Sequence, residues 1–125
     1  MDAVVTLKAR NKMLLARAGE IPLPKIAGFA FGDGGVDDSG NVLTPDTDQE
    51  ELNSELLRKE IDSYTMISET NCKYECTLEN EELAGESISE IALYDTDGDL
   101  VAIKNCTPKG KDGDFEMKFE ITDCF

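Results

Sequence analysis

The stretch Glu90-Ile91-Ala92-Leu93-Tyr94-Asp95-Thr96-Asp97-Gly98-Asp99-Leu100-Val101-Ala102-Ile103 decides how the C-terminal half of this chain folds. Apolar residues flank an acidic turn on both sides. Asp97-Gly98 is a dipeptide typical of a two-residue hairpin loop, in which both central residues need positive φ. The stretch therefore predicts a β-hairpin, with one strand over residues 87–94 and the other over residues 100–106.

The same turn also suggests a cation site, because Asp95, Asp97 and Asp99 alternate as the first ligands of a calcium loop do. An EF-hand loop, however, needs glycine at its sixth position and a bidentate Glu at its twelfth. Counted from Asp95, the glycine here is fourth and the twelfth residue is Cys106. We therefore predict a structural turn, no metal site and no cofactor. A small acidic metal-binding or regulatory module using the Asp95–Asp99 turn is the alternative function.

Two helices are predicted in the N-terminal half. Residues 4–18 have helical periodicity, with Thr6 as a possible cap and Gly19 at the end. The stripe expected to be buried on this helix is Leu7, Asn11, Leu14, Leu15 and Ala18. Thr44-Pro45-Asp46 has the residue types of a second helix start, so a helix is expected over residues 44–59.

The remaining segments alternate with the period of strands. Strands are expected over residues 25–31, 61–68, 72–78 and 115–121, in addition to the hairpin. The predicted fold class is α+β, with two helices packed on a mostly antiparallel sheet or meander. With 125 residues and no linker, the chain is expected to form a single domain over residues 1–125.

Composition excludes several functions. The formal net charge of −15 argues against nucleic acid and against anionic membranes as partners. The chain has no histidine and no nucleophile motif, so we predict no enzyme and no catalytic residue. Cys72 and Cys76 are expected four residues apart on one strand face, too far apart for one zinc ion, so the cysteines are predicted to be reduced and buried.

The charge is divided unevenly along the chain. Residues 1–25 hold five basic and two acidic residues, whereas residues 26–125 hold seven basic and 25 acidic residues. A basic end on an acidic body can dock on a neighbouring acidic surface, and Lys8, Arg10 and Lys12 are the candidate docking residues. The composition favours the other interpretation, that this basic helix face folds onto the acidic body of its own chain, since runs of charge are usually solvated faces.

Two segments carry a resemblance to a known family. Ile26-Ala27-Gly28-Phe29-Ala30-Phe31-Gly32-Asp33-Gly34-Gly35 resembles the "x-V-G-D-G-G" segment of the N-terminal domain of phage tail-collar fibre proteins. Ser89 to Ala102 resembles that family's "x-E-I-G-L-Y-D-x-D-G-x-L-I-A" hairpin, with Ala92 where the family often has glycine. The resemblance covers nearly the whole chain.

The resemblance implies a structural role without catalytic residues. The family's domain attaches a fibre to the baseplate of a contractile tail, commonly as a trimer, and similar modules occur in phage-tail-like bacteriocins. We therefore expect a fibre or adapter attachment protein located in the virion tail. Its expected partners are other tail and baseplate subunits and further copies of itself, with a trimer favoured. The N-terminus does not resemble a signal peptide, so assembly is expected in the cytoplasm of the host bacterium.

Overall fold

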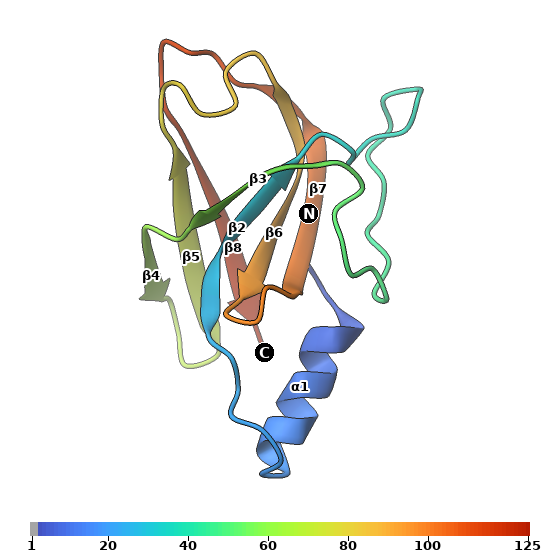
Figure 1. Cartoon of the computed structure of the whole chain (residues 1–125), viewed down its shortest axis with the longest axis vertical. Coiled ribbons are helices and arrows are strands. Elements are labelled where there is room, and N and C mark those ends of the chain that lie inside the picture. The colour runs from blue at the N-terminus through green and yellow to red at the C-terminus, as the bar shows by residue number, and fades with distance from the viewer. Residues whose placement is uncertain (1–2) are drawn as a thin grey trace.

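A computed structural model describes residues 3–125 of the chain as two packed antiparallel sheets with one short helix beside them (Figure 1). The first sheet has the strand order β1-β7-β6-β2-β3 and the second β4-β5-β8. The elements are β1 Val4–Val5, α1 Leu7–Arg17, β2 Ile26–Gly32, β3 Glu55–Glu60, β4 Ser63–Met66, β5 Asn71–Leu78, β6 Ser87–Asp95, β7 Leu100–Gly110 and β8 Met117–Cys124.

The main core lies between the two sheets. Alternation along β2 turns Phe29 and Phe31 toward this core, where the Phe31 ring meets Phe119 of β8 edge-on, with ring centroids 5.2 Å apart. The other buried members of this core are Cys76, Leu78, Ile88, Ile91, Leu93, Ala102 and Ile121. The buried core thus contains side chains from the facing sides of both sheets, which is the arrangement of a β-sandwich.

The opposite face of the first sheet is covered by the long connection between β2 and β3. Leu52 of that connection packs in a second buried cluster with Ala30, Ala92, Leu100 and Ile103. Among residues 3–125, no helix is long and apolar enough to cross a membrane.

The predicted fold class is wrong in one main respect: the described residues contain a single helix, and strands dominate. Residues 44–54 form turns and extended chain, and Glu55–Glu60 is strand β3. The reason is tertiary. β3 pairs with β2, with Phe31 opposite Leu57, and so provides hydrogen-bond partners for the backbone groups of β2 that β6 does not pair. Long-range pairing overrides the local helix-start signal of Thr44-Pro45-Asp46.

The first helix is confirmed but shorter than predicted, since Val4 and Val5 form the edge strand β1. The Thr6 side chain caps it by accepting a hydrogen bond from the Ala9 amide at 3.1 Å. Gly19, with φ of 85°, ends it. The buried stripe was predicted incorrectly: Leu7, Asn11, Leu14 and Ala18 are exposed, and Ala9 is the one buried residue of α1.

The predicted hairpin over residues 87–106 is confirmed as β6 and β7, but its turn differs from the expectation. Within the turn, Gly98 is the one residue with a positive φ, of 89°. The Gly98 amide donates to the Asp95 carbonyl, and the Asp95 amide donates to the Asp99 carbonyl, both at 2.9 Å. The loop is therefore one residue longer than predicted and has glycine at its left-handed position.

Candidate functional site

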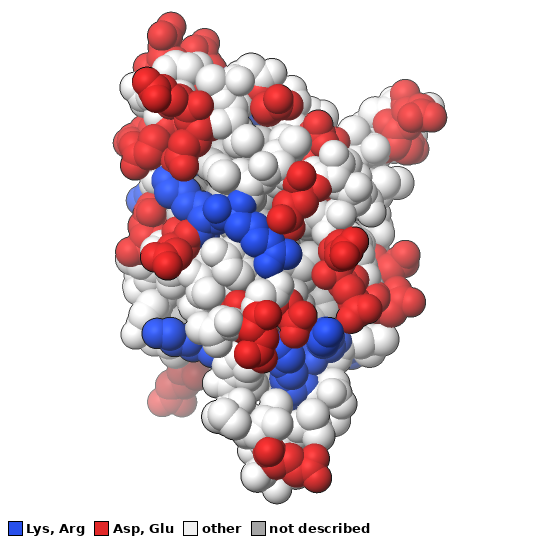
Figure 2. All heavy atoms as spheres, viewed as in Figure 1, with Lys and Arg blue, Asp and Glu red and all other residues white. Residues whose placement is uncertain are grey.

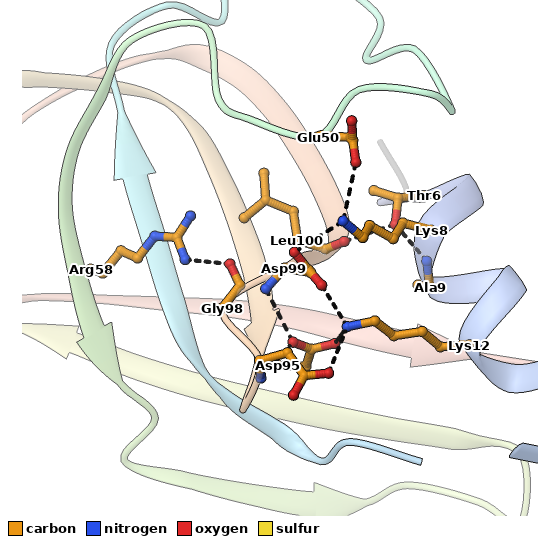
Figure 3. Close-up of polar contacts among 11 residues, drawn as sticks. Thr6, Lys8, Ala9, Lys12, Glu50, Arg58, Asp95, Gly98, Asp99 and Leu100 are labelled. Atoms are coloured by element: carbon orange, nitrogen blue, oxygen red, sulfur yellow. Dashed lines mark hydrogen bonds and ion pairs between the residues drawn. The ribbon is translucent and has the colours of Figure 1, made fainter. Parts of the chain in front are cut away.

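Helix α1 meets the β6–β7 turn through one lysine surrounded by three aspartates (Figure 3). The Lys12 ammonium donates to Asp95 Oδ2 at 2.7 Å, to Asp99 Oδ2 at 2.7 Å and to Asp97 Oδ2 at 3.0 Å. We call these four residues the Lys12 cluster. The three carboxylates lie close enough together to hold a metal ion, and the Lys12 ammonium hydrogen-bonds to all of them. A metal ion at this place would have to displace Lys12, which argues against the alternative function.

Asp95 anchors the cluster because it is only 3% exposed. Its Oδ1 accepts the backbone N–H groups of Asp97 at 3.0 Å and Asp99 at 3.1 Å, which leaves Oδ2 for the lysine. Burial lowers the pKa of Lys12, but the hydrogen bonds to the aspartates outweigh it and raise that pKa above its ordinary value. The hydrogen bond from Lys12 likewise lowers the pKa of Asp99. Lys12 and Asp99 are therefore both charged at neutral pH.

Further contacts hold α1 and the turn in place. The Thr6 hydroxyl donates to the Leu100 carbonyl at 2.8 Å, so the residue that caps α1 also binds β7. Lys8 reaches Glu50 at 3.3 Å and Asp99 at 3.4 Å. From the other side of the hairpin, Arg58 donates to the Gly98 carbonyl at 2.7 Å. The turn is thus held between a helix and a strand.

The three candidate docking residues occupy different positions. The Lys12 side chain is only 12% exposed inside its cluster, and Lys8 is 45% exposed beside Glu50. Arg10 lies on the exposed side of α1 and forms no ion pair within residues 3–125. In Figure 2 acidic side chains form several groups on the visible face, and basic side chains lie beside acidic ones where α1 meets the body. Two of the three residues therefore bind the acidic body of their own chain.

A second site, which sequence reasoning missed, lies on the same strand β6. Glu90 is fully buried and accepts three backbone hydrogen bonds, from Gly34 at 2.9 Å, Asn53 at 2.9 Å and Ser54 at 2.7 Å. We call Glu90 with these three N–H groups the Glu90 site. A buried carboxylate needs such donors, and charge-assisted bonds of this kind are strong. The signal available in the sequence was a glutamate within an apolar strand.

The glycines of Gly32-Asp33-Gly34-Gly35 are explained by close approach to this site. A Cβ on Gly32 would come within 2.4 Å of Glu90 Oε2, and one on Gly35 within 2.0 Å of the Ser89 carbonyl oxygen. The Gly35 amide also donates to Ser89 Oγ at 2.9 Å. The two segments that carry the family resemblance therefore contact each other, and their motif residues stabilise the fold.

The cysteines were predicted to be reduced and buried. All four are free thiols, but only Cys76 is fully buried, in the core between the sheets. Cys72 and Cys106 are half-buried and Cys124 is exposed. Desolvation raises the pKa of the Cys76 thiol to about 12, which keeps it protonated at neutral pH. The prediction of buried cysteines thus fails for Cys124, at the exposed end of β8.

These contacts define a scaffold, a β-sandwich whose acidic motif residues bind parts of its own chain. The family model of the N-terminal domain of phage tail-collar fibre proteins matches residues 1–118, and the chain belongs to that family. It is accordingly a structural component of a phage tail, as the sequence predicted. Comparison with curated proteins and with solved structures gave no significant match.

Proposed function

We propose that residues 1–125 form one non-enzymatic attachment domain that joins a fibre or an adapter to the baseplate of a contractile phage tail or a tail-like bacteriocin particle. The observation that carries this proposal is the family match over residues 1–118. It is supported by the use of the motif residues: Glu90 and the glycines of residues 32–35 hold loops together. The partners in this role are other tail and baseplate subunits and further copies of the chain, with assembly in the host cytoplasm.

Of the three proposed docking residues Lys8, Arg10 and Lys12, Arg10 is the one that we assign to an interface with another molecule. Lys12 holds α1 on the body, so a substitution that reverses its charge would disturb the fold as well as any interface. Arg10 is available to another molecule. We therefore assign docking to the exposed side of α1, with Arg10 as its central charge.

The attachment function is tested by deleting the coding sequence of this chain from the genome that specifies the particle, and then examining the particles that assemble. We expect tails that assemble and contract but carry no fibres in electron micrographs, with the fibre protein recovered in the unassembled fraction. Tails that keep a full set of fibres after the deletion would contradict the proposal.

The docking residue is tested separately, in particles that carry Arg10→Glu. Lys109→Glu is the matched control, because Lys109 is an exposed residue of β7 whose side chain hydrogen-bonds only to Thr107 within residues 3–125. Fibre occupancy should fall with Arg10→Glu and remain at the parental level with Lys109→Glu. Equal occupancy for both variants would place the docking surface elsewhere on the domain.

A further inference from the structure

The exposed side of α1 has a regular composition. Leu7, Arg10, Leu14 and Arg17 are spaced by three or four residues and so lie on one face of the helix, which we call the outer face of α1. Leu7 is 49% and Leu14 63% exposed. Single exposed leucines are common, but two of them separated by about 10 Å and alternating with arginines form an amphipathic surface that residues 3–125 leave uncovered.

A groove with complementary composition lies in the same molecule, beside the edge strand β4. Its volume is about 740 Å³, and it is lined by apolar residues that include Tyr64, Met66 and Phe125. These three side chains are 63%, 58% and 73% exposed. β4 is an outer strand of its sheet, and an exposed apolar edge of this kind is a liability that proteins normally cover.

The charges of the groove, which we call the β4 groove, are opposite to those of the helix. Glu60, Glu69 and Asp123 belong to its lining, and none of them forms an ion pair within residues 3–125. Lys25 is the one basic residue of the lining. Asp123 is half-buried, and desolvation raises its pKa. A guanidinium placed beside these carboxylates would compensate charges that the chain itself leaves uncompensated.

From this complementarity we propose that the outer face of α1 in one copy of the chain binds in the β4 groove of a second copy. This inference deepens the docking role of α1 and rests on it, and it names the partner as another molecule of the same protein. Leu7 and Leu14 contact the apolar lining, and Arg10 and Arg17 pair with the carboxylates of the groove.

The proposed contact is head to tail, because it joins two different surfaces of the chain. Figure 1 shows α1 at the lower end of the molecule and β4 at its left side, so the two surfaces are separate. Each copy can therefore offer its helix to one neighbour and its groove to another. A heterologous contact of this kind gives a ring when the rotation between copies closes, and a filament when it does not.

The test measures the mass of the purified full chain by light scattering and sedimentation, over a concentration series reaching about 1 mM, a range that reveals even weak association. The parent chain should self-associate. Two variants should remain monomeric: a helix variant, Arg10→Glu with Arg17→Glu, and a groove variant, Glu60→Lys with Glu69→Lys. Lys104→Glu with Lys109→Glu, on β7, is the control with the same charge change as the helix variant, and it should associate like the parent.

Mixing the two variants gives the decisive result. The helix variant keeps an intact groove and the groove variant keeps an intact helix, so the parental contact can form between them, and the reversed charges of the other two surfaces also attract each other. An equimolar mixture should therefore associate, whereas each variant alone stays monomeric. Circular dichroism melts of both variants should match the parent, since all four substituted residues are exposed. If a charge variant fails to fold, Leu7→Ser with Leu14→Ser replaces the helix variant and Tyr64→Ser with Met66→Ser the groove variant.

Three outcomes would overturn the proposal. A parent chain that is monomeric over the whole series excludes self-association through this contact. Variants that associate like the parent place the interface elsewhere. Association of the parent together with a mixture that stays monomeric indicates contact between like surfaces, such as helix with helix. Fibre loss on deleting the chain from the particle tests attachment independently, so failure of this inference and failure of the attachment function are distinguishable.

Discussion

Glu90 and Asp95 lie five residues apart on β6 and are both almost inaccessible to water, but their carboxylates accept hydrogen bonds from different kinds of donor. Glu90 accepts three neutral backbone N–H groups from two loops. Asp95 accepts two backbone N–H groups of its own turn and one ammonium from α1. The first carboxylate holds loops of the body together, whereas the second holds a helix on the body by charge.

This difference predicts which contact the fold depends on most. The Glu90 site joins residues 33–35 to residues 53–54 inside the molecule. Loss of its hydrogen bonds should therefore loosen the connection between β2 and β3 that covers the first sheet. The Lys12 cluster lies nearer the surface, where the Asp97 side chain is 59% exposed, and water can partly replace what is lost there.

The largest effect is expected for Glu90→Gln. Glu90 accepts hydrogen bonds through both carboxylate oxygens, whereas Gln has one oxygen acceptor and an NH₂ donor. An N–H of Gly34, Asn53 or Ser54 would therefore face another donor inside the site of the buried Glu90 side chain. We expect a loss of about 3 kcal/mol in the free energy of unfolding, measured by urea denaturation. Glu86→Gln, at an exposed position before β6, is the control and should be neutral. Equal stability of Glu90→Gln and the parent would contradict the role of the Glu90 site.

A smaller effect is expected for Lys12→Met, which keeps the length of the side chain but leaves three carboxylates facing one another. The loss should be about 2 kcal/mol, because the cluster is only partly buried. Lys8→Met is the matched control, since Lys8 is more exposed and its ion pairs are longer, and it should melt close to the parent. A similar effect of both substitutions would show that Lys12 acts only as a general surface charge.

The contribution of Lys12 should depend on pH only at the extremes. Because the pKa of Asp99 is lowered in the folded state, its stabilisation is present above the unfolded value of about 3.9 and is lost as pH falls through the lower folded value. Because the pKa of Lys12 is raised, its stabilisation is complete below about pH 10.4 and is lost only as pH rises through the higher folded value. The stability difference between the parent and Lys12→Met should therefore be constant from about pH 5 to pH 9 and shrink in acid. A difference that changes steadily across neutral pH would contradict this assignment.

The smallest effect is expected for calcium on the parent chain, because the Lys12 ammonium already pairs with the three aspartates. Calcium in excess over a chelator-treated sample should leave the melting temperature unchanged, whereas Lys12→Met should regain part of its lost stability. A large calcium-dependent rise in the melting temperature of the parent would revive the metal-binding alternative.

Local signals in the sequence were sufficient for most of the elements but not for the second predicted helix or for the assembly of the sheets. Thr6 and Gly19 correctly marked the ends of the first helix, and alternation found the strands around Phe29, Cys76 and Leu93. Thr44-Pro45-Asp46 misled, because pairing of β3 with β2 outweighs a local helix start. The stripe of α1 that periodicity predicts to be buried is mostly exposed, since periodicity defines a face without saying which side faces the body.

The two sites were harder to predict because each joins residues distant in the sequence. Lys12 and Asp95 are 83 residues apart, and Gly34 and Glu90 are 56 apart. The sequence separately identified the acidic turn, the basic helix and the glycine-rich turn, and it allowed for a basic helix face folded onto the acidic body. Which lysine would meet which aspartate depends on how α1 is placed by Thr6 on β7, and no local pattern encodes that placement.

The most direct test of the central claim, that Lys12 holds α1 on the aspartate turn, is a double-mutant cycle with Lys12→Met and Asp95→Asn, measured by urea denaturation in the presence of a chelator. Asp95→Asn keeps an oxygen for the backbone N–H groups of Asp97 and Asp99 and removes the charge that faces Lys12. We predict that the free energy of unfolding of the double variant is close to that of the less stable of the two single variants. This corresponds to a coupling energy of about 1–2 kcal/mol. Losses that simply add, with no coupling energy, would contradict the account.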